Sequence, residues 1–125
     1  MKKRLLVVED EAFIRELIKD FFFKDFVVRA VARGDEGLQI FLEETPDAVI
    51  LDVELEGTLR GDHLLKVMKL LKKEIPVVMI SGRGDLKESL IAAGASAFFD
   101  KPFNIQQIRE FFIAKEVLLE TSRAL

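Results

Sequence analysis

The feature that most constrains the fold is a fivefold alternation between short apolar runs and segments with helical periodicity. The apolar runs, which are typical of strands, occupy residues 5–8, 26–31, 49–52, 77–80 and 97–99. The helical segments follow them at about residues 13–21, 34–44, 62–73, 86–93 and 104–120. This alternation predicts a parallel sheet with helices on both faces and right-handed crossovers. We therefore expect an α/β fold of the flavodoxin-like, doubly wound type, with five strands in the order 2-1-3-4-5.

Several polar residues stand where the helical segments begin or end. Asp10 or Glu11 is expected to cap the first helix, Asp62 the third and Asn104 the last. Gly94 is expected to stop the fourth helix, because glycine adopts the left-handed conformation that ends many helices.

Length and composition favour one domain covering residues 1–125, since 125 residues of which 50% are hydrophobic can bury a core. The absence of cysteine excludes a disulfide framework and a thiolate metal site. Acids at residues 9–11 end the first apolar run, which excludes a signal peptide, and no run reaches bilayer length. The net charge of −3 argues against a nucleic-acid surface. We expect a cytoplasmic protein without membrane insertion or direct nucleic-acid binding.

Polar side chains follow four of the five expected strands, at the point where each strand ends. They are Glu9 with Asp10, Asp52, Ser81 and Lys101. Because the carboxyl ends of parallel strands meet at one edge of the sheet, we expect these groups to lie together there.

Asp52 at the end of the central apolar run is the candidate phosphoryl acceptor, because a carboxylate can act as a nucleophile once charge repulsion is removed. Glu9, Asp10 and Asp52 would repel one another and a phosphate, so a divalent cation is needed, and Mg²⁺ prefers such oxygen ligands. Lys101 would neutralise a phosphoryl oxygen, and the Ser81 hydroxyl would donate to another. No general base is required, since aspartate is already ionised at neutral pH.

Five short motifs in this order resemble the response-regulator receiver domain (CheY-like) of two-component signal transduction. They lie at residues 7–11, 50–52, 78–82, 94–95 and 101–103, so the resemblance covers essentially the whole chain. It implies the doubly wound fold, a phosphorylated aspartate at Asp52 and Mg²⁺ as cofactor. It further implies that Asp10, Asp52 and the Glu54 backbone carbonyl bind Mg²⁺ directly, while Glu9 acts mostly through water.

The resemblance also implies a switch and a set of partners. Ser81 and Lys101 would hold the phosphoryl group, Ser81 would move toward it, and Phe98, three positions before the lysine, would turn inward. The Lys101–Pro102 bond is expected to be cis. The donor would be a phosphohistidine on a sensor histidine kinase or a histidine phosphotransfer protein, and the switched surface would bind a downstream protein target.

Three positions depart from the commonest family pattern or vary within it. Glu56 replaces a usual proline four residues after Asp52, and the shorter interval between Ser81 and Lys101 predicts that the fourth helix, or the loop before it, is trimmed. Glu54 and Arg83 occupy variable positions that tune phosphoryl lifetime, and we hypothesise that they pair across the entrance to the site. The start at Met1 and the short tail at residues 121–125 favour a stand-alone regulator over a receiver cut from a larger chain.

Other interpretations remain open at this stage. The acids at 9–11 and Asp52 could be cap and turn residues alone, and the lone His63 is expected to be solvated without a metal or catalytic role. An Mg²⁺-dependent aspartyl-phosphate phosphatase would need a second acid two residues after a nucleophile on the first strand. A flavodoxin-like cofactor carrier would need a hydroxyl- and glycine-rich loop where this chain has three acids. The last alternative is a receiver that binds partners without phosphorylation. We expect a signalling phosphoacceptor and not an enzyme with an external substrate.

Overall fold

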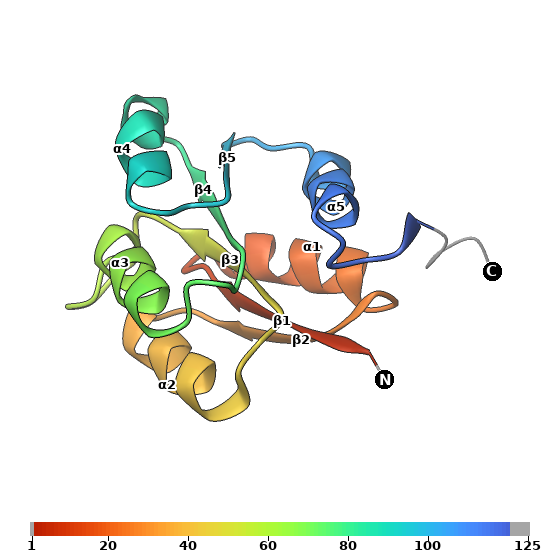
Figure 1. Cartoon of the computed structure of the whole chain (residues 1–125). Helices are drawn as coiled ribbons and strands as arrows, with labels where there is room; N and C mark the ends of the chain where they lie inside the picture. Colours follow the sequence, from red (N-terminus) through yellow and green to blue (C-terminus); the bar gives the residue numbers. More distant parts are fainter. Residues whose placement is uncertain (1, 121–125) are drawn as a thin grey trace.

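The computed structural model describes residues 2–120. Strands and helices alternate along the whole of this range (Figure 1). The strands are β1 (Lys3–Val8), β2 (Phe26–Val31), β3 (Ala48–Asp52), β4 (Val77–Ser81) and β5 (Ala97–Asp100). The helices are α1 (Ala12–Phe22), α2 (Gly34–Glu44), α3 (Gly61–Leu71), α4 (Lys87–Ala92) and α5 (Ile105–Ala114), with a 3₁₀ turn at Gly84–Leu86.

The five strands form one parallel sheet in the order β2-β1-β3-β4-β5, which confirms the predicted topology. In the register, Val8 of β1 lies opposite Leu51 of β3, and Asp52 lies opposite Ile80 of β4. The ends of β1 and β3 are therefore neighbours at the carboxyl edge, where the order of the strands reverses direction. This is the position at which doubly wound folds hold their ligands.

The core consists of two apolar layers, one on each side of the sheet. Alternate strand residues face α2, α3 and α4, as Val49 and Leu51 do, whereas Ile50 between them faces α1 and α5. Figure 1 shows the same division, with α1 and α5 on one side of the sheet and α2 to α4 on the other. Because both faces are covered, β3 and β4 are buried at every residue, which explains their unbroken apolar sequences.

The helix starts differ from the predicted ones at two of three positions. Asn104 caps α5 as predicted, since its side chain accepts a hydrogen bond from the Gln106 amide. Glu11 occupies the N-cap position of α1, but its side chain makes no cap hydrogen bond, so that prediction was wrong in its chemistry. Asp62 is wrong as a cap, because α3 begins one residue before it, with Arg60 at the N-cap.

The last helix is shorter than predicted. It ends at Ala114, and the chain turns at Glu116, whose φ of 61° is left-handed. The turn brings Val117 and Leu118 back into the core, where both are buried. The fourth helix is also short, with six residues, as the trimmed interval predicted. Gly94 follows it with a φ of 111°, the conformation expected of a helix stop.

The tail at residues 121–125, which the sequence analysis considered, lies outside the described residues. Among residues 2–120, none of the helices has the length and apolar character needed to span a membrane.

Candidate functional site

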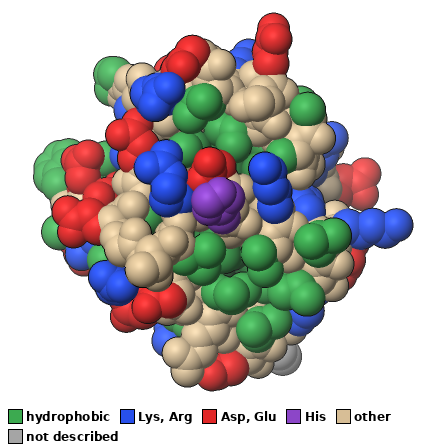
Figure 2. Space-filling view, turned by 90° about the vertical axis from the view of Figure 1, so that its left-hand side faces the viewer, with side chains coloured by type: hydrophobic (Ala, Val, Ile, Leu, Met, Phe, Trp, Pro, Cys, Tyr) green, Lys and Arg blue, Asp and Glu red, His purple; other side chains and the backbone are tan. Residues whose placement is uncertain are grey.

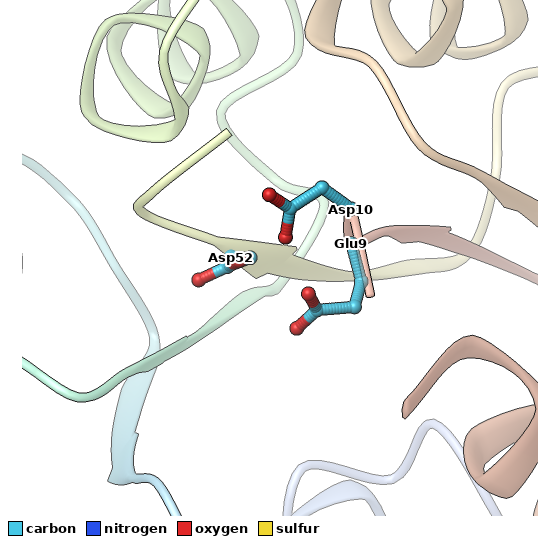
Figure 3. A group of neighbouring side chains, drawn as sticks. All are labelled: Glu9, Asp10 and Asp52. Atoms are coloured by element: carbon cyan, nitrogen blue, oxygen red, sulfur yellow. The ribbon is translucent and has the colours of Figure 1, made fainter. Parts of the chain in front are cut away.

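Three carboxylates meet at the carboxyl edge of the sheet. Glu9 and Asp10 directly follow β1, and Asp52 is the last residue of β3, so the pairing of these strands brings the acids together. One carboxylate oxygen from each of the three lies within 4.8 Å of the others. Figure 3 shows the three side chains directed into the same space. The structure thus brings together the acids that the sequence singled out.

Lys101, which follows β5, supplies the positive charge at this cluster. Its Nζ lies 2.7 Å from Oε1 of Glu9, 3.3 Å from Oδ2 of Asp52 and 3.9 Å from Oε1 of Glu11. The Lys101–Pro102 peptide bond is cis, as expected. The Lys101 amide donates to the Ser81 carbonyl at 2.8 Å, which fastens the end of β5 to the end of β4.

Glu9 is the most deeply buried member of the cluster, with an exposed fraction of 0%. Its Oε2 accepts a hydrogen bond from the Glu11 amide at 3.0 Å. Its Oε1 is buried and accepts no hydrogen bond of good geometry from residues 2–120, although the Lys101 ammonium is close enough for an ion pair. This oxygen can therefore bind a cation beside the Lys101 ammonium or in its place.

Burial changes the pKa values of the charged groups at the site. It raises the pKa of Glu9 from its ordinary 4.5 to about 7, although Lys101 and the Glu11 amide act in the opposite direction. It also raises the pKa of Asp52, against the charge of Lys101. Burial of Lys101 lowers its pKa, but the contacts with Glu9 and Asp52 outweigh this and leave the pKa raised. The single positive charge of Lys101 thus does not offset the negative charges of the three acids.

The backbone around the acids is held by specific contacts. Arg15 in α1 donates from Nη1 to the carbonyls of Glu9 and Asp10, at 2.8 and 2.9 Å. The Glu54 amide donates to Oδ1 of Asp52 at 3.3 Å. Sequence reasoning missed Arg15, because an arginine in the first turns of an amphipathic helix has the pattern of an ordinary solvated residue.

Gly61 fixes the path of the chain beside Asp52. A Cβ at this position would lie 1.9 Å from the Asp52 carbonyl oxygen and 2.7 Å from Cα of Val53. The Gly61 amide also donates to the Val53 carbonyl at 3.0 Å. Only glycine allows α3 to start this close to the end of β3.

The acids open into a hollow of about 240 Å³, which is lined by Asp10, Glu11, Asp52, Glu54, Gly82 and Lys101. Glu11 is therefore part of the site wall, a role that its interpretation as a helix cap did not include. The predicted strand order placed Lys101 beside the acids after β1, but the direction of the Glu11 side chain toward Lys101 depends on the loop between β1 and α1.

The two predicted switch residues occupy different environments. Ser81 is fully buried at the end of β4, and its Oγ accepts a hydrogen bond from the Arg83 amide at 2.9 Å. Its hydroxyl is therefore engaged with its own loop, and Ser81 is not among the residues that line the hollow. Phe98 in β5 is 9% exposed and packs in the core layer beneath α2, α3 and α4.

The hypothesised pair of Glu54 and Arg83 is not formed. The Arg83 guanidinium instead binds Asp85 with two contacts, Nε to Oδ1 at 3.1 Å and Nη2 to Oδ2 at 2.9 Å. Arg83 pairs with Asp85 and not with Glu54 because Asp85 is only two residues away on the same loop, so forming this pair costs little conformational entropy. His63 is exposed in the first turn of α3, which agrees with its interpretation as a solvated residue.

The donor set of the cluster suits a hard divalent cation. All the available ligand atoms are oxygens, three of them on carboxylates, and the buried Oε1 of Glu9 has the Lys101 ammonium as its neighbour. Oxygen-only sets of this kind are the ones that Mg²⁺ and Ca²⁺ select.

Comparison with known proteins identifies relatives over nearly the whole chain. The family model "Response regulator receiver domain" matches residues 5–112. Sporulation initiation phosphotransferase F of Bacillus subtilis (strain 168) is 34% identical over 113 residues, which cover 88% of this chain and 90% of that protein. The chemotaxis protein CheY of the same organism is 32% identical over 114 residues, covering 88% of this chain and 94% of that protein.

Solved structures agree in fold and include proteins of different lengths. A CheY-like receiver domain protein from Methanospirillum hungatei JF-1 superposes with a TM-score of 0.84 at 28% identity, covering 92% of this chain and 94% of that one. NtrX from Brucella abortus has a TM-score of 0.81 at 34% identity, covering 99% of this chain but only 28% of its own. The chain thus matches some relatives in full and a single part of others. It belongs to the response regulator receiver domain family of two-component systems, whose members are signalling phosphoacceptors modified on an aspartate.

Proposed function

We propose that Asp52 is the phosphoacceptor and that it takes its phosphoryl group from a phosphohistidine on a sensor histidine kinase or histidine phosphotransfer protein. One observation carries the proposal: oxygens of Glu9, Asp10 and Asp52 converge within 4.8 Å, with the Lys101 ammonium 3.3 Å from Asp52. An acid in this position is nucleophilic, accessible from the hollow and adjacent to a cation.

The acidic cluster fits Mg²⁺ as the cofactor. Asp10, Asp52 and the Glu54 backbone carbonyl would bind the ion directly, and Glu9 would contribute through water or by exchanging the contact of its Oε1 with Lys101 for the ion. When bound, Mg²⁺ offsets the negative charge that the acids and the incoming phosphoryl oxygens bring to one site.

In the reaction, a carboxylate oxygen of Asp52 forms a bond to phosphorus as the phosphorus–nitrogen bond of the donor breaks. The electron pair of that bond stays on the ring nitrogen, and the donor leaves as neutral imidazole when its other nitrogen carries a proton. Asp52 reacts as the carboxylate, so no proton has to be removed from it. Lys101 is close enough to Asp52 to bind a phosphoryl oxygen, and the Gly82 amide at the wall of the hollow can donate to another. The product is an aspartyl phosphate on the chain itself, with no turnover of an external substrate.

The switch would begin at Ser81. Its Oγ accepts from the Arg83 amide, which leaves the hydroxyl proton free to donate, but Ser81 does not line the hollow, so the loop must bring it closer before it can donate to a phosphoryl oxygen. Movement of the loop after β4 would change the packing of α4 on Phe98, and with it the surface that a downstream protein target binds. A cytoplasmic location follows from the proposed donors, which present their phosphohistidine there.

Glu54 and Arg83 are proposed to tune the lifetime of the aspartyl phosphate separately and not as a pair. Glu54 is exposed on the wall of the hollow, whereas Arg83 is bound to Asp85 above it. Glu54→Ala should change the lifetime by altering water access. Arg83→Ala and Asp85→Ala should change the lifetime in the same direction, because either substitution removes the ion pair that holds the loop after β4. Opposite effects of these two variants would show that Arg83 acts on the lifetime independently of its ion pair with Asp85.

The direct test is intact-mass analysis after incubation with acetyl phosphate and Mg²⁺. We expect one added phosphoryl group on the native chain, and none in Asp52→Asn or in excess chelator. Labelling that persists in Asp52→Asn would assign the acceptor to another residue, and labelling independent of Mg²⁺ would remove the metal from the proposal. Steady hydrolysis of a small phosphate monoester would favour the phosphatase alternative.

A further inference from the structure

Helices α2 and α3 lie side by side and expose an apolar strip on the face of the molecule away from α1 and α5. Their proximity is marked by the hydrogen bond from Nζ of Lys72, just after α3, to Oγ1 of Thr45, just after α2. The leucine strip consists of Leu42, Leu70 and Leu71, with exposed fractions of 51%, 87% and 52%. Figure 2 shows this side of the molecule, with hydrophobic side chains gathered in its lower half. Exposed leucines grouped in this way mark a contact surface.

An acidic edge borders the leucine strip on one side. It consists of Glu36 and Glu43 of α2, which line a shallow hollow together with Arg29 and Val31 of β2. The two acids therefore lie on the side of α2 that faces the β2 edge of the sheet, away from α3.

A basic edge borders the strip on the opposite side. It consists of Lys66 of α3 and Lys73 just after it. This edge lies on the side of α3 that faces the end of α4. Lys69 shows this, because its Cγ lies next to Gly94, 3.0 Å from where a Cβ on that glycine would be. Lys66 is three residues before Lys69 on the same side of the helix, and Lys73 lines a hollow together with Lys69 and Glu74. The three lysines outnumber this one acid, so the edge keeps an excess of positive charge. The surface thus runs in order from acids through leucines to lysines.

A surface with this order is complementary to itself. Consider a two-fold axis that lies in the interface and runs parallel to the helices. Rotation about it turns the second copy to face the first with its two edges interchanged, so the acidic edge of one copy lies opposite the basic edge of the other. The leucine strips of the two copies then meet at the centre. The reverse orientation, with the axis across the helices, would set like charges opposite each other and is disfavoured.

We propose that this α2–α3 face pairs with the same face of a second copy of the chain, forming an isologous dimer in which α2 of each copy packs on α3 of the other. In the part of the chain that the structure describes, Glu36 and Lys66 have no ion-pair partner, so both are available for this contact. None of the residues of this surface lines the hollow at Asp52. The dimer is therefore a property additional to phosphorylation.

The test uses two charge-reversed variants of the full chain. Glu36→Lys with Glu43→Lys makes both edges basic, and Lys66→Glu with Lys73→Glu makes both edges acidic. Sedimentation equilibrium of the native chain up to about 1 mM should give a monomer–dimer equilibrium. Each variant alone should dimerise at least about tenfold more weakly, because its two edge contacts become repulsive. An equimolar mixture of the two variants should restore the dimer, since every contact in the mixed pair is attractive.

The apolar part of the surface is tested with a matched pair of variants. Leu71→Asp should abolish dimerisation, because it buries a charge at the centre of the interface. Phe13→Asp is the control, since Phe13 of α1 is 79% exposed on the other side of the sheet and should leave dimerisation unchanged. Thermal unfolding and acetyl phosphate labelling of Asp52 report folding and the site independently of association.

Three outcomes would overturn the proposal. They are a native chain that stays monomeric up to about 1 mM, a mixture of the charge variants that fails to regain the dimer, and a dimer that survives Leu71→Asp but is lost in Phe13→Asp. Loss of labelling together with normal dimerisation would count against the function of Asp52 alone.

Discussion

The Lys101 ammonium lies 2.7 Å from the Glu9 carboxylate, closer than its 3.3 Å to the Asp52 carboxylate. One cation is therefore shared by two buried acids, and its closer partner is Glu9 and not the proposed phosphoacceptor Asp52. A divalent cation that draws Glu9 away would release Lys101 toward Asp52. Metal binding and positioning of the lysine are thereby linked through Glu9.

Replacing Lys101 should slow phosphorylation more than it disturbs the fold. Lys101→Gln removes the charged donor beside Asp52, a contact worth about 1.5–3 kcal/mol, so the rate of labelling by acetyl phosphate should fall at least about tenfold. Time-resolved intact-mass analysis at fixed Mg²⁺ measures this rate. Lys115→Gln, which removes an exposed lysine after α5, is the control. Equal rates in the two variants would show that Lys101 has no part in the transfer.

Glu9 should make the stability of the metal-free protein depend on pH. Its pKa in the folded chain is about 7, above its ordinary 4.5, so the folded state holds this proton more tightly than the unfolded state does. The stabilising contribution is complete below pH 4.5 and is lost as the pH rises toward 7. The loss is at most about 3 kcal/mol, since one pKa unit corresponds to about 1.36 kcal/mol.

Urea unfolding in chelator, repeated across this pH window, measures the effect. Glu9→Gln should flatten the dependence and leave the smaller part that Asp52, whose pKa is also raised, contributes. Glu88→Gln, an exposed acid of α4, should retain the native slope. A Glu9→Gln profile parallel to the native one would count against the buried acid as its cause.

Two glycines near Asp52 should respond differently to alanine. Gly61→Ala sets a methyl group 1.9 Å from the Asp52 carbonyl oxygen, so the end of β3 has to move. We expect a loss of about 2–4 kcal/mol in the free energy of unfolding and slower labelling of Asp52. Gly82→Ala meets no heavy atom within 4 Å and should stay within about 0.5 kcal/mol of the native stability. Equal stability of the two variants, measured by urea unfolding, would contradict this account of the α3 start.

The buried ion pair of Arg109 and Asp25 should stabilise the fold without affecting the chemistry. Arg109 in α5 approaches both carboxylate oxygens of Asp25 at 3.3 Å, and both residues are buried. Arg109→Met leaves a buried carboxylate without this partner and should cost about 3–5 kcal/mol. The double variant Asp25→Asn with Arg109→Met should recover part of that loss. If the double variant is as unstable as the single one, the uncompensated charge is not the reason.

Sequence patterns predicted the strands well because the physical signal for them is strong. A strand covered on both faces, such as β3 or β4, must be apolar throughout, and a charged residue directly after it has to lie at the edge of the sheet. This reasoning brought Asp52 to its observed position. The same logic, with the predicted strand order, set Lys101 and the acids after β1 beside it.

Helix ends were predicted less well because tertiary contacts decide them. Asp62 has the chemistry of a cap, but the close packing of Gly61 against the end of β3 starts α3 one residue earlier. Helix-forming residues continue to Glu120, but burial of Val117 and Leu118 requires the chain to turn at Glu116. Local preference was outweighed by packing in both cases.

The partner of Arg83 could not be predicted because two acids compete for it. Glu54 is separated from it by a long stretch of sequence and Asp85 by two residues, and only the conformation of the loop decides between them. The contact between Oγ of Ser81 and the Arg83 amide likewise depends on the conformation of this loop and not on residue type alone.

Arg15 clasps two main-chain oxygens, those of Glu9 and Asp10, at 2.8 and 2.9 Å. Both atoms are thereby taken out of competition for an incoming ion, which must rely on side chains from this stretch. The same clasp ties the first helix mechanically to the acidic tip of β1. A partner protein that displaces α1 when it binds would therefore also move the backbone of Glu9 and Asp10, before any phosphoryl transfer takes place.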